Sequence, residues 1–189
     1  MYRTISCIVV LVFALILTRC GQPKTPAVTQ PEFTAGIETI DSTYVASLSV
    51  MGPYSEMGKS FAEIMAWFTT NKIEPMGAPF GIFYDDPTKV KPESTRYEIC
   101  FPVASQTKGD DQVKVKKLDP VQVAATIYAG PYDKIGETYG KLFTWITDNK
   151  YQVVGAPHEF YLNDPAKVPA ESLKTKVAIP VVVVPGEAK

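Results

Sequence analysis

The chain has 189 residues, of which 46% are hydrophobic, and its formal net charge is −1 at pH 7. This composition is that of a globular protein, and the length fits one domain or two small modules that share a core. The balanced charge, without runs of Lys or Arg, argues against direct nucleic-acid binding, because phosphate contacts require clustered positive charge.

The first twenty residues, 1–20, have the pattern of an export signal. Arg3 gives the segment a positive start, and residues 5–17 are almost wholly apolar. This run is short for a membrane-spanning helix, which takes about 20 residues, but it has the length of the apolar part of a signal peptide. It ends at Cys20 and resembles a bacterial lipoprotein signal, in which such a Cys is lipidated. Arg19 departs from that pattern, because a small residue normally precedes the Cys, so an uncleaved N-terminal anchor stays the alternative.

Residues 21–36 follow as a predicted flexible tether, rich in Pro and Thr and without hydrophobic periodicity. A tether behind a lipid-modified Cys would hold a domain at 37–189 off a membrane surface. The expected location is the bacterial cell envelope, as a membrane-anchored lipoprotein that faces the periplasm or the exterior. Cys100 is the only Cys of the folded part, and we interpret it as a small buried side chain.

Two stretches of the chain repeat each other. Residues 45–103 align with residues 123–181 without a gap, at an offset of 78, and about a third of the positions are identical. Self-similarity of this kind indicates that one structural unit occurs twice. The matched residues include turn formers and a tryptophan: Gly52-Pro53-Tyr54 with Gly130-Pro131-Tyr132, Trp67 with Trp145, Gly77-Ala78-Pro79 with Gly155-Ala156-Pro157, and Asp86-Pro87 with Asp164-Pro165.

Each copy has the order strand, helix, strand, strand. Apolar and β-branched residues indicate a first strand, and Gly-Pro-Tyr ends it before a helix with apolar residues at spacings of three and four. A middle strand begins after Gly-Ala-Pro, and the last strand follows an Asp-Pro loop, so the short connections favour antiparallel pairing. The expected ranges are 44–50 and 121–128, 54–71 and 132–149, 80–84 and 158–162, and 95–103 and 173–184, with 37–40 and 113–118 extending the first strands.

These elements predict an α+β fold, built as a tandem duplication of a β-α-β-β module with pseudo-twofold symmetry. Two modules that pair edge to edge would form one antiparallel sheet of about six to eight strands, with both helices on one face. The other face would be left as a concave platform, and an uncovered apolar sheet face favours a ligand cleft.

This arrangement resembles the GyrI-like small-molecule-binding domain, which is also the effector-binding half of AraC- and MerR-type regulators. The resemblance implies a cleft between the modules that binds apolar, often cationic compounds, with an acidic residue at the place of Glu98. Some relatives are implied to hydrolyse strained, cyclopropane-containing compounds. The helix-turn-helix of the transcriptional members has no counterpart in this sequence, which argues against direct gene regulation. The resemblance covers about residues 37–185 and rests on the two Gly-Pro-Tyr turns, the Gly-Ala-Pro before the middle strand, Tyr84-Asp85-Asp86-Pro87, and Tyr97-Glu98-Ile99-Cys100 before Pro102.

Glu98 is the main candidate for contact with a ligand. Its neighbours in the strand are apolar and should face the helices, so Glu98 should point at the platform. A carboxylate among aromatic rings attracts a cation, the ring faces add about 0.5–2 kcal/mol, and desolvation would raise its pKa. The alternative is structural, because Lys176 occupies the equivalent position of the second copy and the two side chains would form an ion pair.

Aromatic side chains are abundant, with ten Tyr, nine Phe and two Trp, and several should line the cleft. His158, the only histidine, matches Phe80 of the first copy, and a single His without further ligands at metal spacing does not indicate haem or a metal. No phosphate loop, Ser/His/Asp set or CxxC is present, so neither a cofactor nor a metal is expected. The predicted ligand-binding residues are Glu98, Tyr84, Phe83, Tyr128, Tyr161 and Lys176.

The sequence therefore predicts an exported, lipid-anchored protein that binds a hydrophobic small molecule in an aromatic cleft, with Glu98 as the counter-charge if the molecule is cationic. Binding without catalysis is the favoured interpretation, no nucleic-acid partner is expected, and the oligomeric state is left open. One alternative is a hydrolase that acts on a strained or hydrophobic molecule with Glu98 as general base. A second alternative is an envelope module whose cleft takes a peptide or a partner subunit.

Overall fold

The computed structural model describes residues 32–186. The predicted signal at 1–20, with the lipidation site Cys20, and most of the predicted tether lie outside the described residues. Within the described part of the chain, no helix is long and apolar enough to cross a membrane. Strand β1 begins at Ala35, just before the predicted start of the domain, and Phe33 already packs against the core.

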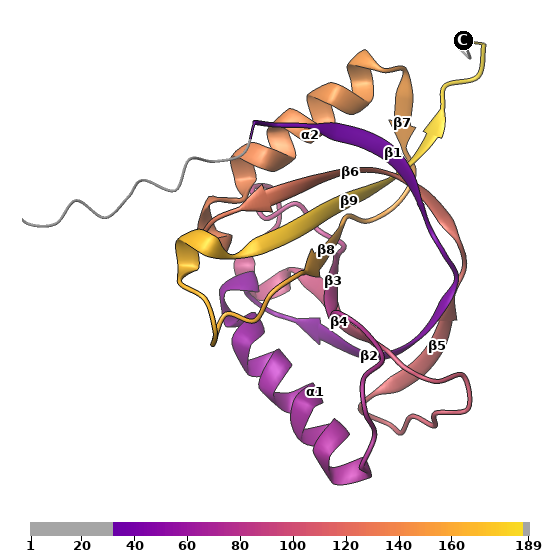
Figure 1. The fold of residues 1–189 in the computed structure, drawn as a ribbon, viewed down its shortest axis with the longest axis vertical. Coiled ribbons are helices and arrows are strands. Elements are labelled where there is room, and N and C mark those ends of the chain that lie inside the picture. Colours follow the sequence, from indigo (N-terminus) through magenta and orange to yellow (C-terminus); the bar gives the residue numbers. More distant parts are fainter. Residues whose placement is uncertain (1–31, 187–189) are drawn as a thin grey trace, which may run out of the picture.

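The described residues form a curled antiparallel sheet with few helices, which is an α+β fold (Figure 1). The strand order is β1-β6-β9-β8-β3-β4-β2-β5, and β7 pairs with β9 beside this path. The helices are α1 (Met57–Asn71) and α2 (Gly136–Asp148), and a 3-10 turn precedes each of them. The strands are β1 (Ala35–Ile40), β2 (Thr43–Met51), β3 (Phe80–Phe83), β4 (Arg96–Pro102), β5 (Lys114–Leu118), β6 (Val121–Ala129), β7 (Tyr151–Val153), β8 (His158–Tyr161) and β9 (Lys174–Val183).

The predicted strands and helices are confirmed. Strand ends shift by no more than two residues, whereas α1 and α2 begin three and four residues later than expected, because a 3-10 turn precedes each helix. The antiparallel pairing is confirmed as well. The sequence analysis missed β7, a strand of three residues that follows α2 and pairs with the end of β9. Three residues are too few to show the alternation by which a strand is recognised.

The two halves of the sheet meet where β3 pairs with β8. These strands are only four residues long, but backbone hydrogen bonds from Phe83 to Pro157 and from Tyr161 to Pro79 extend the contact at both ends. The register therefore fixes which side chains of the two halves stand side by side. Phe80 lies opposite Phe160, Gly81 opposite Glu159, and Ile82 opposite His158.

Two further ladders connect the halves at the edges of the sheet. β1 pairs with β6, β2 pairs with β5, and both ladders keep the same register, so the links at 41–42 and 119–120 lie opposite each other. Figure 1 shows the chain passing from β1 in one half to β2 in the other. Each edge strand thus pairs in one half of the sheet, and the next strand of the chain lies in the other half: β1 pairs with β6 and is followed by β2, and β5 pairs with β2 and is followed by β6.

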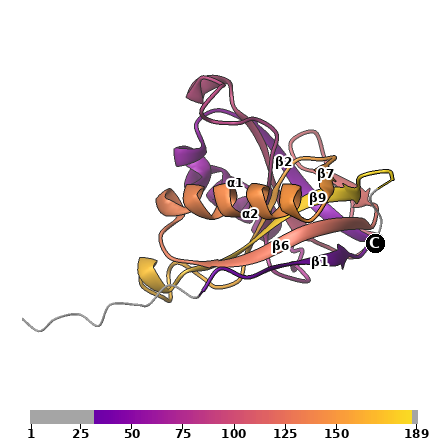
Figure 2. The ribbon, with the colours of Figure 1, turned by 90° about the horizontal axis from the view of Figure 1, so that it is seen from above.

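Both helices cover the same face of the sheet (Figure 2). On this face each helix builds a hydrophobic core with the strands of its own half. The apolar spacing that predicts the helices therefore also marks the residues that become buried. α1 buries Ile64, Trp67 and Phe68 against Leu48, Tyr97 and Ile99, and α2 buries Leu142 and Ile146 against Ala124, Val177 and Ile179.

The chain turns from strand to helix at Gly52 and Gly130, which have φ angles of 153° and 141°. Residues with a side chain rarely adopt this region of backbone space, so the Gly of both Gly-Pro-Tyr turns is required by the backbone. The amides of Gly52 and Gly130 donate to the carbonyls of Thr95 and Leu173. Each turn is thereby tied to the start of the last strand of its half.

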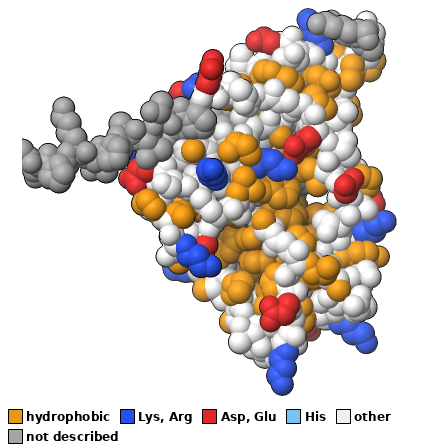
Figure 3. Space-filling model, viewed as in Figure 1, with side chains coloured by type: hydrophobic (Ala, Val, Ile, Leu, Met, Phe, Trp, Pro, Cys, Tyr) orange, Lys and Arg blue, Asp and Glu red, His pale blue; other side chains and the backbone are white. Residues whose placement is uncertain are grey.

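The face without helices is filled near the seam between β3 and β8. Val45, Phe80 and Cys100 belong to a buried cluster there, and Phe160 packs against it with its ring centroid 4.8 Å from that of Phe80. Figure 3 shows hydrophobic side chains gathered between the two halves of the curled sheet. The prediction of an open platform is therefore wrong at the seam, because the curl of a twisted sheet brings together side chains that a flat sheet would expose. Burial of Cys100, which raises its pKa to about 12, is confirmed.

His158 borders this cluster and is half-buried, with its ring 5.8 Å from that of Phe80. Its Nδ1 atom is buried without a hydrogen-bond partner among residues 32–186, and burial lowers its pKa to about 4. The unfolded chain would bind this proton near pH 6.5. Protonation therefore favours the unfolded state between these two values.

We predict that the free energy of unfolding falls as the pH drops from about 6.5 to about 4, by up to about 3 kcal/mol from His158 alone. His158→Phe should remove this part of the pH dependence, because Phe80 shows that the sheet accommodates Phe at the equivalent position. Urea denaturation of both proteins across this pH range measures the effect. Equal pH slopes for the two proteins would contradict the prediction.

Candidate functional site

A buried carboxylate lies at the seam, on the face that carries the helices. Glu159 of β8 stands opposite Gly81 of β3 and is only 8% exposed. Tyr139 of α2 donates a hydrogen bond of 2.8 Å from its hydroxyl to Oε1, and the Tyr161 hydroxyl lies 3.4 Å from Oε2. The carboxylate is thus held from a helix and from its own strand.

Glu159 has no cationic partner in the described part of the chain. Burial raises its pKa, the hydrogen bonds from Tyr139 and Tyr161 lower it, and no Lys or Arg among residues 32–186 contributes to the shift, which is upward overall. A buried carboxylate without a counter-charge is costly, because desolvation disfavours its charged form. This site would therefore gain free energy from a cation that reached it.

Aromatic rings from both halves gather around Glu159. The Tyr161 ring packs edge-on against Phe61 of α1 and against Tyr132 at the start of the turn before α2, with centroid distances of 5.4 and 5.6 Å. Burial raises the pKa of Tyr132, and the negative charge of Glu159 raises it further. We call the rings of Phe61, Tyr132, Tyr139 and Tyr161 with the Glu159 carboxylate the interhelical site.

Gly81 provides the room that these rings need. A Cβ atom at position 81 would lie 2.8 Å from the Phe83 ring, closer than real Cβ atoms approach other atoms, and in a tight contact of 3.1 Å with the Tyr161 hydroxyl oxygen. A side chain here would push Tyr161 away from the carboxylate. At the position opposite Glu159, strand β3 therefore contributes only backbone atoms.

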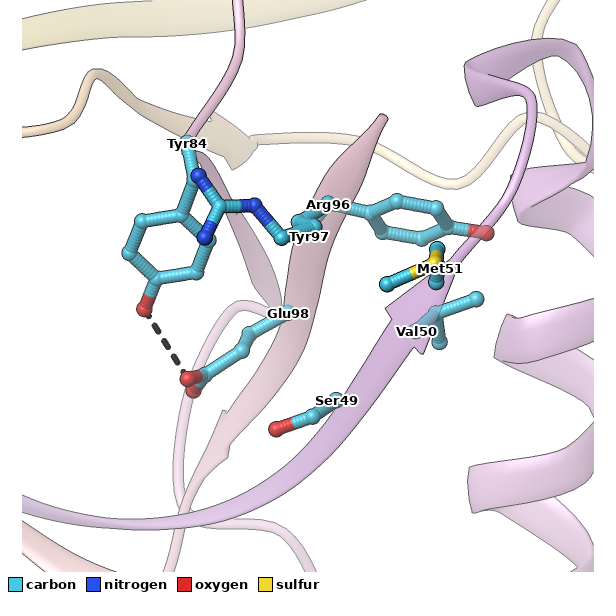
Figure 4. A pocket seen from close by; sticks show the side chains of 7 residues that line it. All are labelled: Ser49, Val50, Met51, Tyr84, Arg96, Tyr97 and Glu98. Carbon is cyan, nitrogen blue, oxygen red and sulfur yellow. Dashed lines mark hydrogen bonds between the residues drawn. The ribbon is translucent and has the colours of Figure 1, made fainter. Parts of the chain in front are cut away.

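Glu98 lies on the helix-free face, where it already has partners. The hydroxyl of Tyr84 donates to Oε1 at 2.9 Å, Ser47 Oγ donates a short hydrogen bond to Oε2, and Lys116 Nζ lies 2.5 Å from Oε2. Burial raises the pKa of Glu98, but the hydrogen bonds from Lys116, Ser47 and Tyr84 outweigh it, and the net shift is downward. A shallow pocket beside Glu98 is lined by Ser49, Val50, Met51, Tyr84, Arg96 and Tyr97 (Figure 4).

The predicted ion pair between Glu98 and Lys176 is wrong. Lys176 Nζ instead lies 2.6 Å from Glu38 Oε1 and 4.9 Å from the centroid of the Phe160 ring. Strands β8 and β3 lie between β9 and β4, so the two residues are separated by the seam. Each of them finds its partner on the edge strand of its own half.

Comparison with known proteins identifies the fold. Residues 35–182 match the family described as the GyrI-like small molecule binding domain. The chain belongs to this family. The resemblance that the sequence motifs indicated is thereby confirmed.

Several known proteins are similar to this GyrI-like domain. A DNA gyrase inhibitor of Serratia proteamaculans (strain 568) is 28% identical over 141 residues, which are 69% of this chain and 88% of that protein. EcmrR in a cryo-EM complex with DNA shares the fold with a TM-score of 0.73 at 20% identity; the match covers 80% of this chain but only 58% of EcmrR. The structure of SAV2435 bound to tetraphenylphosphonium gives a TM-score of 0.56 at 9% identity, over 79% of this chain and 94% of that one.

The six residues predicted to bind a ligand do not lie together in the GyrI-like domain. Tyr84 accompanies Glu98 on the helix-free face, and Lys176 lies on that face in the other half. Phe83 and Tyr161 face the helices instead, because the strand alternation puts them on the same side as Gly81 and Glu159. Tyr128 donates from its hydroxyl to the Pro131 carbonyl at 2.8 Å and so closes its own turn.

The residues predicted to bind a ligand did not include Gly81 or four members of the interhelical site, which are Phe61, Tyr132, Tyr139 and Glu159. The sequence does contain a signal for Glu159, because this residue aligns with Gly81 at the offset of 78. A Glu in one copy and a Gly in the other, at the same position of a buried strand, calls for a structural explanation. Strand alternation would then have placed Glu159 on the helix face. The pairing of β3 with β8, which sets these two positions side by side, could not be known from the alignment.

We predict that Lys116→Met destabilises the GyrI-like domain by about 1–2 kcal/mol, because it leaves the Glu98 carboxylate, whose side chain is 11% exposed, without its cation. The loss should shrink at acidic pH, where Glu98 becomes protonated. Chemical denaturation at neutral and acidic pH measures both effects. Lys89→Met, which breaks the exposed pair with Asp86, is the matched control and should change stability little; equal losses would contradict the prediction.

Proposed function

We propose that this domain reversibly binds an apolar, cationic small molecule between α1 and α2, with Glu159 as the counter-charge. The observation that carries the proposal is the buried Glu159 carboxylate, which has tyrosine hydroxyls around it and no cation within the described residues. Membership of a family described by small-molecule binding supports it.

Two physical terms would supply the affinity. The aromatic rings of the interhelical site offer apolar surface, whose burial against a ligand contributes about 25 cal/mol per Å². The ring faces add about 0.5–2 kcal/mol for a cation that lies over them. The carboxylate then distinguishes cationic from neutral ligands, because burial makes a charge without a partner costly.

This proposal transfers the counter-charge from Glu98, where the sequence analysis placed it, to Glu159. Glu98 is neutralised by Lys116 at 2.5 Å, so a cationic ligand would have to compete with a charge of the protein itself. The lowered pKa of Glu98 also makes it a weak general base. A hydrolase, the alternative function, would therefore rest on Glu159, whose pKa is raised; turnover of a strained substrate that Glu159→Gln abolishes would establish it.

We further infer that the domain arose by tandem duplication with pseudo-twofold symmetry. The repeat at an offset of 78 supports this inference. The strand order supports it too, because β1-β6-β9-β8 and β3-β4-β2-β5 hold equivalent elements in mirrored sequence along the sheet. A ligand between α1 and α2 would then lie at the junction of the two copies.

The test of binding uses tetraphenylphosphonium, an apolar cation, and a neutral molecule of similar shape, triphenylphosphine oxide. We expect Glu159→Gln to weaken binding of the cation about 10- to 100-fold, the range of a charge-assisted contact, and to leave the neutral molecule almost unaffected. Binding of the cation to the unaltered protein should also weaken as the pH falls through the raised pKa of Glu159, because the protonated side chain carries no charge. Isothermal titration calorimetry measures both.

Glu98→Gln is the matched control for this experiment. If the interhelical site holds the ligand, Glu98→Gln leaves the affinity for tetraphenylphosphonium unchanged. Loss of binding in Glu98→Gln with full binding in Glu159→Gln would instead return the ligand to the helix-free face.

We also propose that the domain is exported and held at the envelope by a lipid on Cys20. The apolar segment, the Cys at its end and the Pro- and Thr-rich stretch behind it support this proposal. Cys20→Ser should release the protein from the membrane fraction and abolish labelling by a radioactive fatty acid in the bacterial host. Unchanged membrane association without labelling would favour an uncleaved N-terminal anchor.

A further inference from the structure

Two ion pairs on the helix-free face have opposite orientations. In one half, the acid Glu98 lies on β4 and the base Lys116 on the edge strand β5. In the other half, the base Lys176 lies on β9 and the acid Glu38 on the edge strand β1. The four positions correspond at the offset of 78, because 38 aligns with 116 and 98 aligns with 176. Both charges of the pair are thus exchanged between the halves.

The chain has a second way to pair its edge strands. β1 pairs with β6 and β5 with β2, which we call the crossed pairing. β1 is joined to β2 by residues 41–42 alone, and β5 to β6 by residues 119–120 alone. Links of two residues are the length of a tight β-hairpin. In a folded-back pairing, β1 would therefore lie on β2, and β5 on β6.

The folded-back pairing would keep the same register. Lys116 now stands opposite Val45, and Glu38 stands opposite Val123. A two-residue hairpin at 41–42 would place Glu38 opposite Val45, in the present position of Lys116. A hairpin at 119–120 would likewise place Lys116 opposite Val123. The backbone ladders of the two pairings are therefore alike, and side chains must decide between them.

The charges distinguish the two pairings. Folding back would bring Glu38 to Glu98 and Lys116 to Lys176, so that two attractive pairs become two repulsive ones. The repulsion would be felt, because the side chains of Glu98 and Lys176 are only 11% and 27% exposed and water screens partly buried charges weakly. If both pairs had the same orientation, the folded-back pairing would also contain two attractive ion pairs, and electrostatic energy would not distinguish the two pairings.

We propose that the opposite orientation of these ion pairs selects the crossed pairing and so specifies how the two halves are joined. Glu38, Lys116 and Lys176, together with Glu98, thus act against a competing fold as well as for the native one. The links add to this selection, because Asp41-Ser42 and Asp119-Pro120 lack the Gly or Asn that two-residue hairpins favour. An experiment on the charges must therefore first replace these link residues, which disfavour two-residue hairpins, with residues that allow them.

The experiment uses the full chain with Asn-Gly at both links, through Asp41→Asn, Ser42→Gly, Asp119→Asn and Pro120→Gly. Three exposed positions are changed to Cys, and the disulfide that forms between two of them shows which pairing the edge strand β1 has adopted. The thiol at 39 faces position 122 in the crossed pairing and would face position 44 in the folded-back pairing, and directly opposed residues are close enough for a disulfide. Mass spectrometry of the oxidised and digested protein measures the relative amounts of the 39–122 and 39–44 disulfides. The reporter changes are Thr39→Cys, Tyr44→Cys and Gln122→Cys.

With the native charges we expect the disulfide between 39 and 122 to dominate. Glu98→Lys with Lys116→Glu keeps an ion pair in the crossed fold but gives both halves the same orientation. The disulfide between 39 and 44 should then rise clearly above its level with the native charges, because the charges no longer distinguish the two pairings. Adding Glu38→Lys and Lys176→Glu makes the orientations opposite again, and the disulfide between 39 and 122 should dominate once more.

A second variant guards against misfolding. Glu38→Lys with Lys176→Glu alone removes the opposition from the other half and should give the same mixture of disulfides. Circular dichroism shows which variants fold. The proposal is overturned if folded variants with pairs of the same orientation keep the 39–122 disulfide alone, or if the fourfold variant fails to restore it.

Discussion

The pairing of β3 with β8 is the contact on which the rest of the structure depends. Each half has its own helix and its own core, and this short ladder brings the two helices to the same face. Its register places Glu159 opposite Gly81, so the carboxylate and the rings of both halves converge at one point. The opposite face of the same ladder stacks Phe80 on Phe160 and places the half-buried His158 beside them. A shift of one residue would exchange the two faces and place the carboxylate in that apolar cluster.

The two buried carboxylates of the sheet differ in their electrostatic surroundings, and their pKa values shift in opposite directions. Glu98 has Lys116, Ser47 and Tyr84 around it, and its pKa is lowered. Among residues 32–186, Glu159 has tyrosine hydroxyls around it and no cation, and its pKa is raised. A charge whose partner is built into the fold contributes to the fold, whereas a charge without one is free to contribute to binding. A carboxylate among the apolar residues of a strand thus correctly indicated that Glu98 is a buried acid, but its surroundings decide its role.

Much of the fold could be predicted from the sequence, because local features determine it. The Gly-Pro-Tyr turns end strands through the φ angles of Gly52 and Gly130, and the apolar spacing marks both helices. The site could not be predicted in the same way, because it depends on which strands pair across the molecule. Glu98 and Lys176 looked like partners while the arrangement of the halves was unknown, and the seam between β9 and β4 separates them. Phe83 and Tyr161 were placed with Glu98 although strand alternation turns them towards the helices.

The position of Glu159 also explains why the two sequence repeats had to differ there. Positions 81 and 159 are equivalent in the alignment, and they stand opposite each other at the seam. Identical copies would place either two carboxylates or two glycines at this point. Two buried carboxylates would repel each other, and two glycines would leave no carboxylate at the seam. One Glu against one Gly gives a single carboxylate with room for the Tyr161 hydroxyl beside it. The turn residues that the backbone requires, Gly52 and Gly130, are the same in the two sequence repeats, whereas positions 81 and 159, which face each other at the seam, differ.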